Sequence, residues 1–172
     1  MKAIVAVTKD WGIGKENKLL MSIPEDMKFF RETTKNSVVV MGRKTLESFP
    51  GGNPLKNRFN IVITRDDNYR KEGVTVVHSV EAAMAAASAA MLMTDDSGER
   101  IYGDCFVIGG ESIYRQALDY VDTVFVTKMD IKLPADSFFP NLDEDENFKL
   151  THSSENKDFN GVGFRFCVYE RA

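Results

Sequence analysis

The sequence predicts an α/β fold with a mainly parallel sheet and an antiparallel hairpin at its C-terminal edge. Short apolar runs rich in β-branched residues alternate with segments whose apolar residues recur at helical spacing, which favours a parallel sheet. The C-terminal part differs, because two strand-like runs, Phe148–His152 and Phe164–Glu170, are joined by a polar loop that ends at Asn160–Gly161. The length of 172 residues suits a single domain over residues 1–172.

The apolar runs predict buried strands, because each is short and is bounded by polar residues or glycine. In chain order they are Ala3–Val7, Val38–Met41, Phe59–Thr64, Val74–Val77, Cys105–Ile108 and Val121–Thr127.

The helical patterns predict four helices, which are Glu25–Thr34, Arg43–Ser48, Val80–Met91 and Glu111–Leu118. Pro24 suits the first position of the first helix, and Ser22 and Glu25 have the spacing of a capping box before it. Ser79 can cap the third helix.

The composition is that of an ordinary globular protein, with 43% hydrophobic and 28% charged residues. A net charge of −4 gives no overall attraction for nucleic acid or for an anionic membrane, so we expect neither partner. No N-terminal signal segment and no apolar run of membrane-spanning length is evident. Cys105 and Cys167 lie in apolar runs without the spacing of a zinc site. We therefore expect no metal and a reducing, cytoplasmic compartment.

Asp26 is a carboxylate on the apolar face of the first helix. Asp26, Phe29, Phe30 and Thr33 fall at i, i+3, i+4 and i+7, which is one helix face. An acid beside two phenylalanines needs a hydrogen-bond donor or a cation to meet it. The alternative is that Asp26 only favours the positive end of the helix dipole. The glycine-rich loop that leads to this acid favours a ligand site.

Glycines and cations follow three of the predicted strands, in Gly42-Arg43-Lys44-Thr45, Thr64-Arg65 and Gly109-Gly110-Glu111-Ser112. Because the carboxyl ends of parallel strands share one edge of a sheet, Arg43, Lys44 and Arg65 could meet around one phosphate. Singly, each could be a solvated surface cation, and the paired glycines could form a tight turn. Gly12-Ile13-Gly14-Lys15 completes neither a P-loop nor a dinucleotide fingerprint.

Taken together, these residues resemble the dihydrofolate reductase family over essentially the whole chain. The resemblance rests on the order and spacing of Gly12-Ile13-Gly14 with Glu16-Asn17, Ile23-Pro24-Glu25-Asp26 through Phe30, Val40-Met41-Gly42-Arg43-Lys44-Thr45, Pro54-Leu55 with Arg58, Val107-Ile108-Gly109-Gly110 with Tyr114, Thr127, and Asp136 with Phe139-Pro140. It implies an eight-stranded mixed sheet with four helices. It also implies a monomer that transfers hydride from NADPH to the pterin ring of 7,8-dihydrofolate, giving the tetrahydrofolate used in one-carbon metabolism and thymidylate synthesis.

For the substrate, the resemblance implies that Asp26 accepts hydrogen bonds from the pterin amino and N3 groups, with the Thr127 hydroxyl behind it. Asp26 would orient and polarise the ring while water delivers the proton. Arg58 would pair with the glutamate carboxylate. Met21 stands where the family usually has Trp, and Leu20 where it has Pro, so the residues that hold this water differ here. The remaining implied substrate contacts are Ala6, Met27, Phe30, Phe49, Leu55 and Ile108.

For NADPH, the resemblance implies phosphate contacts from Arg43, Lys44, Thr45, Thr64 and Arg65, with His78 near the 2′-phosphate. It implies a cis peptide between Gly109 and Gly110. The other implied cofactor contacts are Ala6, Ile13, Gly14, Leu19, Gly42, Ile108, Glu111, Ser112, Ile113 and Tyr114. Trp11, the only tryptophan, begins the segment expected over the nicotinamide. We expect this segment to close on ligand binding and to change the emission and solvent quenching of Trp11. The alternative is that Trp11 packs permanently at the base of the loop.

Two alternative functions fit these residues less well. A pyrimidine reductase of flavin biosynthesis has a similar fold, but Asp26 within Pro-Glu-Asp and the matching Arg58 argue against it. A nucleotide-binding regulatory module without catalytic activity would have no need of Asp26 on an apolar face.

An insertion around Met93–Gly103 lengthens one helix–strand connection, and no function follows from it.

Overall fold

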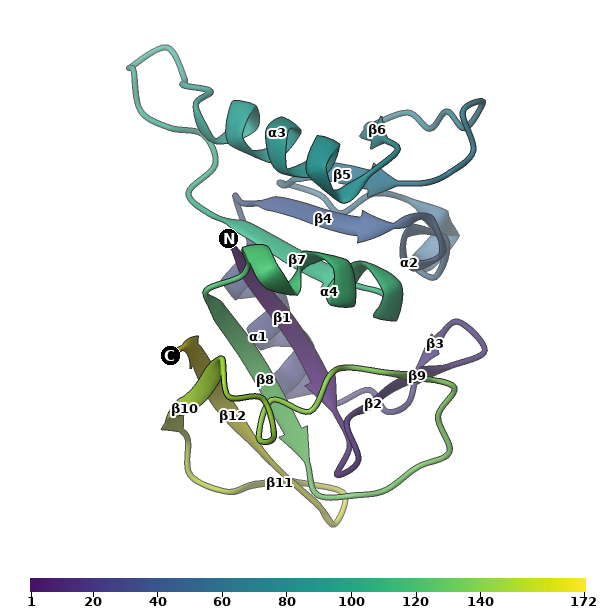
Figure 1. Cartoon of the computed structure of the whole chain (residues 1–172), viewed down its shortest axis with the longest axis vertical. Helices are drawn as coiled ribbons and strands as arrows, with labels where there is room; N and C mark the ends of the chain where they lie inside the picture. The colour runs from purple at the N-terminus through teal and green to yellow at the C-terminus, as the bar shows by residue number, and fades with distance from the viewer.

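The computed structural model describes residues 1–172 and contains a central twisted sheet with helices on both faces (Figure 1). The strands run in the order β10-β12-β8-β1-β7-β4-β5-β6. All neighbours from β8 to β6 are parallel, whereas β12 is antiparallel to β8 and β10 is antiparallel to β12. Their bounds are β1 Lys2–Val7, β4 Val38–Gly42, β5 Phe59–Ile63, β6 Val74–Val77, β7 Cys105–Gly109, β8 Thr123–Met129, β10 Phe148–Ser153 and β12 Val162–Arg171.

This arrangement confirms the predicted mixed sheet with its antiparallel C-terminal strands. One further strand, β11 (Lys157–Phe159), pairs with β12 inside the segment that the sequence predicted as a polar loop. The predicted strand Val121–Thr127 begins two residues later, at Thr123, and continues to Met129.

The four predicted helices are present as α1 (Pro24–Thr34), α2 (Arg43–Glu47), α3 (Val80–Met91) and α4 (Glu111–Ala117). Short 3₁₀ turns follow α2 and α4, at Pro50–Gly52 and Leu118–Tyr120. Side chains alternate across β4: Val38 and Val40 pack toward α3, and Val39 and Met41 pack toward α1 and α2. The parallel strands are therefore buried on both faces, which explains why they read as continuous apolar runs.

The start of α1 corrects one prediction and bears out another. Pro24 is the first helical residue, as predicted, but the capping residue is Ile23, and no side chain caps the helix. Ile23 is buried in a cluster with Met129 and Phe164, so packing fixes the helix entry, and the Ser22–Glu25 capping box does not form. Ser79 does cap α3, since its Oγ accepts from the backbone N–H of Ala82 at 3.0 Å.

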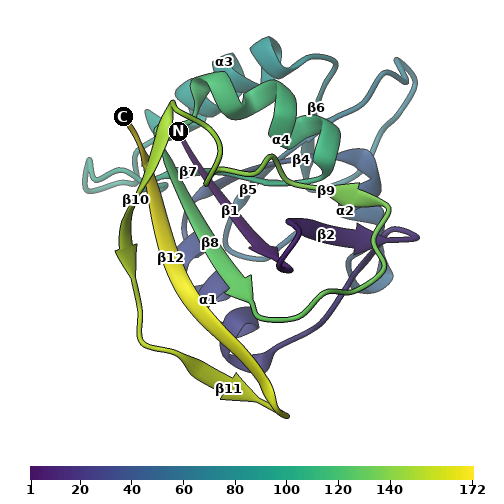
Figure 2. The ribbon, with the colours of Figure 1, turned by 60° about the horizontal axis from the view of Figure 1, so that its bottom comes forward.

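The glycine-rich segment was predicted as a loop, but it forms a small antiparallel sheet of β2 (Gly12–Lys15), β3 (Lys18–Leu19) and β9 (Ser137–Phe138) beside the end of β1 (Figure 2). Trp11, just before β2, is only 4% exposed. Its ring stacks on Phe139 at a centroid distance of 6.2 Å and meets Tyr169 edge-to-face at 5.9 Å. In this structure, Trp11 therefore packs at the base of the segment.

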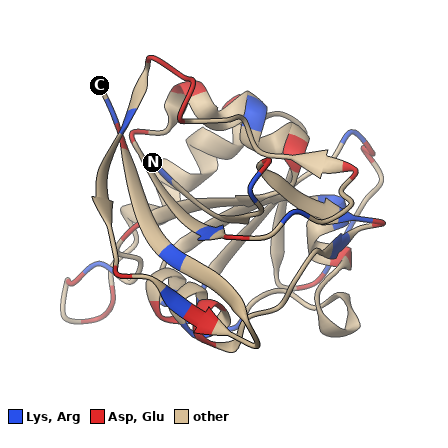
Figure 3. Ribbon diagram, turned by 90° about the horizontal axis from the view of Figure 1, so that it is seen from below, with Lys and Arg blue, Asp and Glu red and all other residues tan.

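The surface carries acidic and basic residues interspersed along the chain (Figure 3). The insertion after α3 is an exposed loop closed by an antiparallel bridge between Thr94 and Arg100. None of the helices is long and apolar enough to cross a membrane.

Candidate active site

Asp26 and Thr127 meet between α1 and the centre of the sheet. Thr127 Oγ1 donates a hydrogen bond of 2.6 Å to Asp26 Oδ1, and Thr127 is only 3% exposed. Burial raises the pKa of Asp26 above its usual value, and the hydrogen bond from Thr127 opposes this effect only in part. The site therefore contains a desolvated carboxylate with a fixed orientation.

An apolar wall extends from this carboxylate. Phe30 on α1, Phe49 and Leu55 pack against the cluster that contains Ile108 of β7. Ala6 on β1 is the register partner of Thr127, so both side chains share the sheet face that α1 covers. Met21 packs beside Ala6 in the cluster around Ile23, and Met27 is 40% exposed. A flat, partly apolar ligand could lie on this wall with its polar edge at Asp26.

Arg58 lies farther along the same wall as a fixed cation. Its Nε donates to Thr34 Oγ1 at 3.0 Å, and its Nη1 and Nη2 donate to the carbonyls of Lys56 and Arg31 at 3.1 and 3.2 Å. Its guanidinium carbon is 6.0 Å from the centroid of Phe30. Burial lowers the pKa of Arg58, and the nearby Arg31 adds to this effect, but a guanidinium stays charged in proteins. Because none of its partners is a carboxylate, Arg58 can pair with an anionic group of a ligand.

Glycines bring two strand ends together at the edge of the sheet. Met41 of β4 pairs with Gly109 of β7, and the Gly109–Gly110 peptide bond is cis, as the resemblance implied. Gly109 has φ +132°, a conformation that a side chain would disfavour. A Cβ on Gly42 would lie 3.2 Å from Ile113 Cγ1, so the end of β4 fits closely against the start of α4. A Cβ on Gly109 or Gly110 would in turn lie 3.3 or 3.5 Å from Thr45 Oγ1, so the glycines allow β4, β7 and the start of α4 to pack closely.

Tyr114 and Ile113 of α4, which the resemblance implies as cofactor contacts, pack against this edge of the sheet. Tyr114 is 5% exposed, and its hydroxyl donates to the carbonyl of Ile4 at 2.7 Å. Burial raises the pKa of Tyr114. Ile113 is also buried. Both side chains pack α4 against Gly42 and Gly109. The Tyr114 hydroxyl is already bonded to Ile4 and Ile113 is apolar, so neither side chain offers a free polar group to a ligand.

The glycine-rich segment is tied to this edge through β9. Glu111 Oε1 accepts the backbone N–H of Phe138, and Asp136 Oδ2 accepts the N–H of Glu16 at 2.9 Å. Ser112 Oγ accepts from Gln116. Gly14 is buried and Ile13 is partly buried against the core, but Leu19 is 62% exposed on β3. Gly14 and Ile13 are thus packed inward, whereas the Leu19 side chain is directed to solvent.

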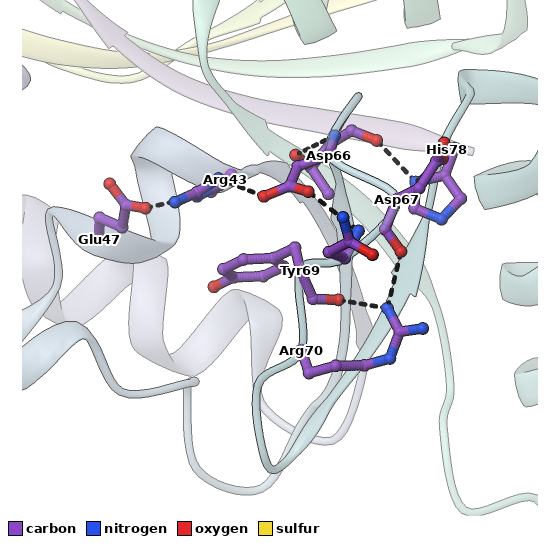
Figure 4. Close-up of polar contacts among 9 residues, drawn as sticks. Arg43, Glu47, Asp66, Asp67, Tyr69, Arg70 and His78 are labelled. Carbon is purple, nitrogen blue, oxygen red and sulfur yellow. Dashed lines mark hydrogen bonds and ion pairs between the residues drawn. The ribbon is translucent and has the colours of Figure 1, made fainter.

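The predicted phosphate residues lie where α2 begins and β5 ends. Figure 4 shows Arg43 at this place, between Glu47 and Asp66. Arg43 Nε pairs with Glu47 Oε1 at 2.7 Å, and its Nη1 lies 3.4 Å from Asp66 Oδ2. The Arg43 guanidinium also lies over Tyr69, 4.6 Å from the ring centroid. Lys44 and Arg65 are exposed and form no ion pair, and the Thr45 side chain lies beside Gly109.

His78 closes this corner. Its Nδ1 lies 2.8 Å from the carbonyl oxygen of Thr64, so Nδ1 carries the proton that is donated. His78 also lines a cavity of about 570 Å³ together with Arg70, Lys71, Glu72, Val74 and Val76. Contacts through Asp66 and Thr64 therefore bring Arg43 and His78, which are far apart in the sequence, into one corner of the structure. Figure 4 shows Arg43 and His78 on either side of Asp66 and Asp67.

Sequence reasoning missed the three residues that surround Arg43. Glu47 carried a signal, because it follows Arg43 by four positions on a predicted helix. Asp66 and Tyr69 carried none, since their approach to Arg43 depends on the adjacency of β4 and β5.

Comparison with known proteins identifies the family of this chain. A model of the dihydrofolate reductase family matches residues 1–171. Dihydrofolate reductase of Staphylococcus haemolyticus is 34% identical over 169 residues, covering 98% of this chain and 93% of that protein. The bifunctional dihydrofolate reductase-thymidylate synthase of Glycine max is 35% identical over 183 residues, and this chain spans 33% of its length.

A solved structure of dihydrofolate reductase from Enterococcus faecalis, complexed with NADP(H) and RAB-propyl, has a TM-score of 0.83 at 30% identity. The match covers 99% of this chain and 95% of that chain. The fold, the family model and the relatives confirm the family predicted from the motifs. The chain belongs to the dihydrofolate reductase family.

Proposed function

We propose that this protein reduces 7,8-dihydrofolate to 5,6,7,8-tetrahydrofolate with NADPH. The observation that carries the proposal is the buried Asp26 carboxylate, held by Thr127 at one end of an apolar wall whose other end carries Arg58. A dihydrofolate molecule has matching parts: a flat pterin with a donor edge, an aromatic linker and a terminal carboxylate.

Asp26 orients the substrate and polarises it. Asp26 Oδ1 is engaged by Thr127, which leaves the rest of the carboxylate to accept hydrogen bonds from the pterin amino and N3 groups. Negative charge at that edge raises the basicity of the nitrogen that receives the proton, and water delivers that proton. Phe30, Phe49 and Leu55 exclude bulk water from the ring and the linker. Arg58 binds the glutamate carboxylate.

The residues present fit NADPH, which supplies the hydride when bound. Gly42, Gly109 and Gly110 let β4, β7 and the start of α4 pack closely, since an added Cβ on Gly42 would meet Ile113 at 3.2 Å. The cofactor would lie along the edge that these strand ends form. Arg43, Lys44 and Arg65 provide cations for the 2′-phosphate at the ends of β4 and β5. The hydroxyls of Thr45 and Thr64 lie on the same edge and can donate to phosphate oxygens.

Met21 sets this chain apart within the proposed mechanism. A methionine thioether has no hydrogen-bond donor, so the Met21 side chain cannot donate to the water that protonates the substrate. Met21 instead packs against the cluster that contains Ile23. We assign the orientation of that water to the substrate, because Asp26 and Thr127 serve the amino and N3 edge of the pterin.

We also propose that the enzyme acts as a monomer in the cytoplasm. Both cysteines, Cys105 and Cys167, are free and buried, which suits a reducing compartment. Burial raises the pKa of the Cys105 thiol to about 12, so it is unreactive at neutral pH.

The test is spectrophotometric NADPH oxidation by the purified protein with 7,8-dihydrofolate, run beside a pyrimidine substrate of flavin biosynthesis. We expect NADPH oxidation with dihydrofolate and none with the pyrimidine. NADPH binding without turnover of either substrate would indicate a regulatory module, and turnover of the pyrimidine would indicate the related reductase.

A further inference from the structure

Arg43, at the candidate phosphate site, forms ion pairs with Glu47 and Asp66. Its Nε is bound to Glu47 Oε1 at 2.7 Å, and its Nη1 faces Asp66 Oδ2 at 3.4 Å. The face of its guanidinium lies over the ring of Tyr69 (Figure 4). A guanidinium has five N–H donors in a fixed fork, so each acid that it holds reduces what it can offer to a phosphate.

Asp66 is held in place by its own turn. Its backbone N–H donates to Thr64 Oγ1 at 3.2 Å, and its Oδ1 accepts the N–H of Asn68 at 2.9 Å. With Oδ1 fixed in this way, Oδ2 is directed at Arg43. The pairing with Arg43 is thus built into the turn after β5 and does not depend on a freely rotating side chain.

Glu47 differs from Asp66 in its geometry. Glu47 belongs to α2, one helical turn after Arg43, and it binds Nε at the side of the guanidinium. Asp66 binds the terminal nitrogen Nη1 and follows directly after Arg65, the other cation assigned to the 2′-phosphate. A phosphate bound by both Arg43 and Arg65 would therefore lie nearer to the Asp66 carboxylate than to the Glu47 carboxylate.

Acids offset most of the positive charge at this corner. Arg43, Lys44, Arg65, Arg70 and Lys71 carry five positive charges, and Glu47, Asp66, Asp67 and Glu72 carry four negative ones. The cations alone would attract a phosphate dianion strongly, and the four acids weaken that attraction.

We propose that Asp66 determines cofactor specificity: its carboxylate competes with the 2′-phosphate of the cofactor for Arg43, and so narrows the preference for NADPH over NADH. This inference rests on the proposed function, which places the 2′-phosphate at Arg43 and Arg65. Asp66 is a counter-ion to Arg43 in the cofactor-free protein and repels the phosphate in the complex.

The test is Asp66→Asn, because an asparagine oxygen can still accept the N–H of Asn68 while the negative charge is removed. Binding of adenosine 2′,5′-bisphosphate, adenosine 5′-monophosphate, NADPH and NADH is measured by calorimetry at neutral pH. We expect the two ligands with a 2′-phosphate to bind about five- to tenfold more tightly, as the removal of one nearby charge predicts. The two ligands without it should change little, and the gain should shrink as salt is added.

The matched control is Asp67→Asn. It removes the same charge one position along, but Asp67 faces His78 at 3.9 Å and does not contact Arg43. We expect Asp67→Asn to tighten binding of the bisphosphate clearly less than Asp66→Asn does. An equal gain from both variants would overturn the proposal, because a general field would then explain the effect without the contact to Arg43.

Two further outcomes separate this inference from the proposed function. If the bisphosphate binds the wild-type protein, Arg65→Ala weakens it, and Asp66→Asn does not tighten it, the role of Asp66 is wrong and the proposed function stands. If the wild-type protein binds neither NADPH nor the bisphosphate, the proposed function fails, and the inference fails with it.

Discussion

The Thr127 hydroxyl and the Asp26 carboxylate, 101 positions apart in the sequence, are joined by a hydrogen bond of 2.6 Å. Thr127→Val removes this bond while keeping the shape of the side chain. Because the bond is the one contact that lowers the pKa of Asp26, the pKa should rise further in the variant. Infrared titration of the carboxylic acid band would measure it, with Thr127→Ser, which keeps the hydroxyl, as the control. An unchanged pKa in Thr127→Val would contradict the role given to this bond.

Asp26→Asn should lose turnover by about 10²–10³-fold and yet stabilise the fold at neutral pH. Burial raises the pKa of Asp26 in the folded state above its unfolded value. The contribution of Asp26 to stability is therefore fully present below the unfolded pKa and is lost as the pH rises through the folded pKa. Thermal unfolding should show a higher Tm for the variant at neutral pH, by a few degrees, and no such gain in acid. The same Tm difference at both pH values would exclude this linkage.

Arg58→Ala should raise the KM for dihydrofolate with little effect on NADPH affinity. The guanidinium is fixed by Thr34 Oγ1 and two carbonyls, so it needs little reordering to bind a carboxylate. Loss of a charge-assisted pair corresponds to about 1.5–3 kcal/mol. Steady-state kinetics would test this, with pteroate, which lacks the glutamate, as a binding control. If the variant weakens pteroate as strongly as folate, Arg58 does not bind the glutamate.

Arg65→Ala should weaken NADPH and barely change NADH, because Arg65 is exposed and has no protein partner to lose. Dissociation constants for both cofactors, followed by protein fluorescence, are the measurement. Arg70→Ala is a suitable control, since Arg70 is a nearby cation that donates to the carbonyls of Asp67 and Tyr69. Equal losses for NADPH and NADH would show that Arg65 does not bind the 2′-phosphate.

Trp11 should report little of ligand binding by solvent quenching. Its ring packs on Phe139 and Tyr169, and Lys128 Nζ lies 5.3 Å from its centroid. Acrylamide should therefore quench the free, NADPH-bound and ternary forms about equally, after correction for energy transfer to NADPH. This outcome differs from the sequence-based expectation that the segment around Trp11 moves on ligand binding. Stronger quenching in the free protein than in the bound forms would support that expectation instead.

The sequence predicted the sheet well because its strands are buried on both faces and read as apolar runs. It also placed Asp26, because an acid at helical spacing with two phenylalanines is visible in a single helix. It missed the β2–β9 pairing, in which Gly12 faces Phe138, because such a contact leaves no local pattern. It missed the cap of α1 because Ile23 packs against Met129 and Phe164, far along the chain. The network around Arg43 was missed for the same reason.

The position of β1 in the sheet bears on how the protein is made. β1 leaves the ribosome before the other strands of this sheet, yet it lies between β7 and β8 near the centre of the sheet. Both neighbours come from the second half of the chain, so a nascent chain that ends before Thr123 holds β1 without β8 and Asp26 without Thr127. Until then, the edge of β1 that pairs with β8 has unpaired backbone N–H and C=O groups, available to chaperones or to other strands. The Asp26 carboxylate can meet Thr127 only once the chain has been synthesised beyond β8.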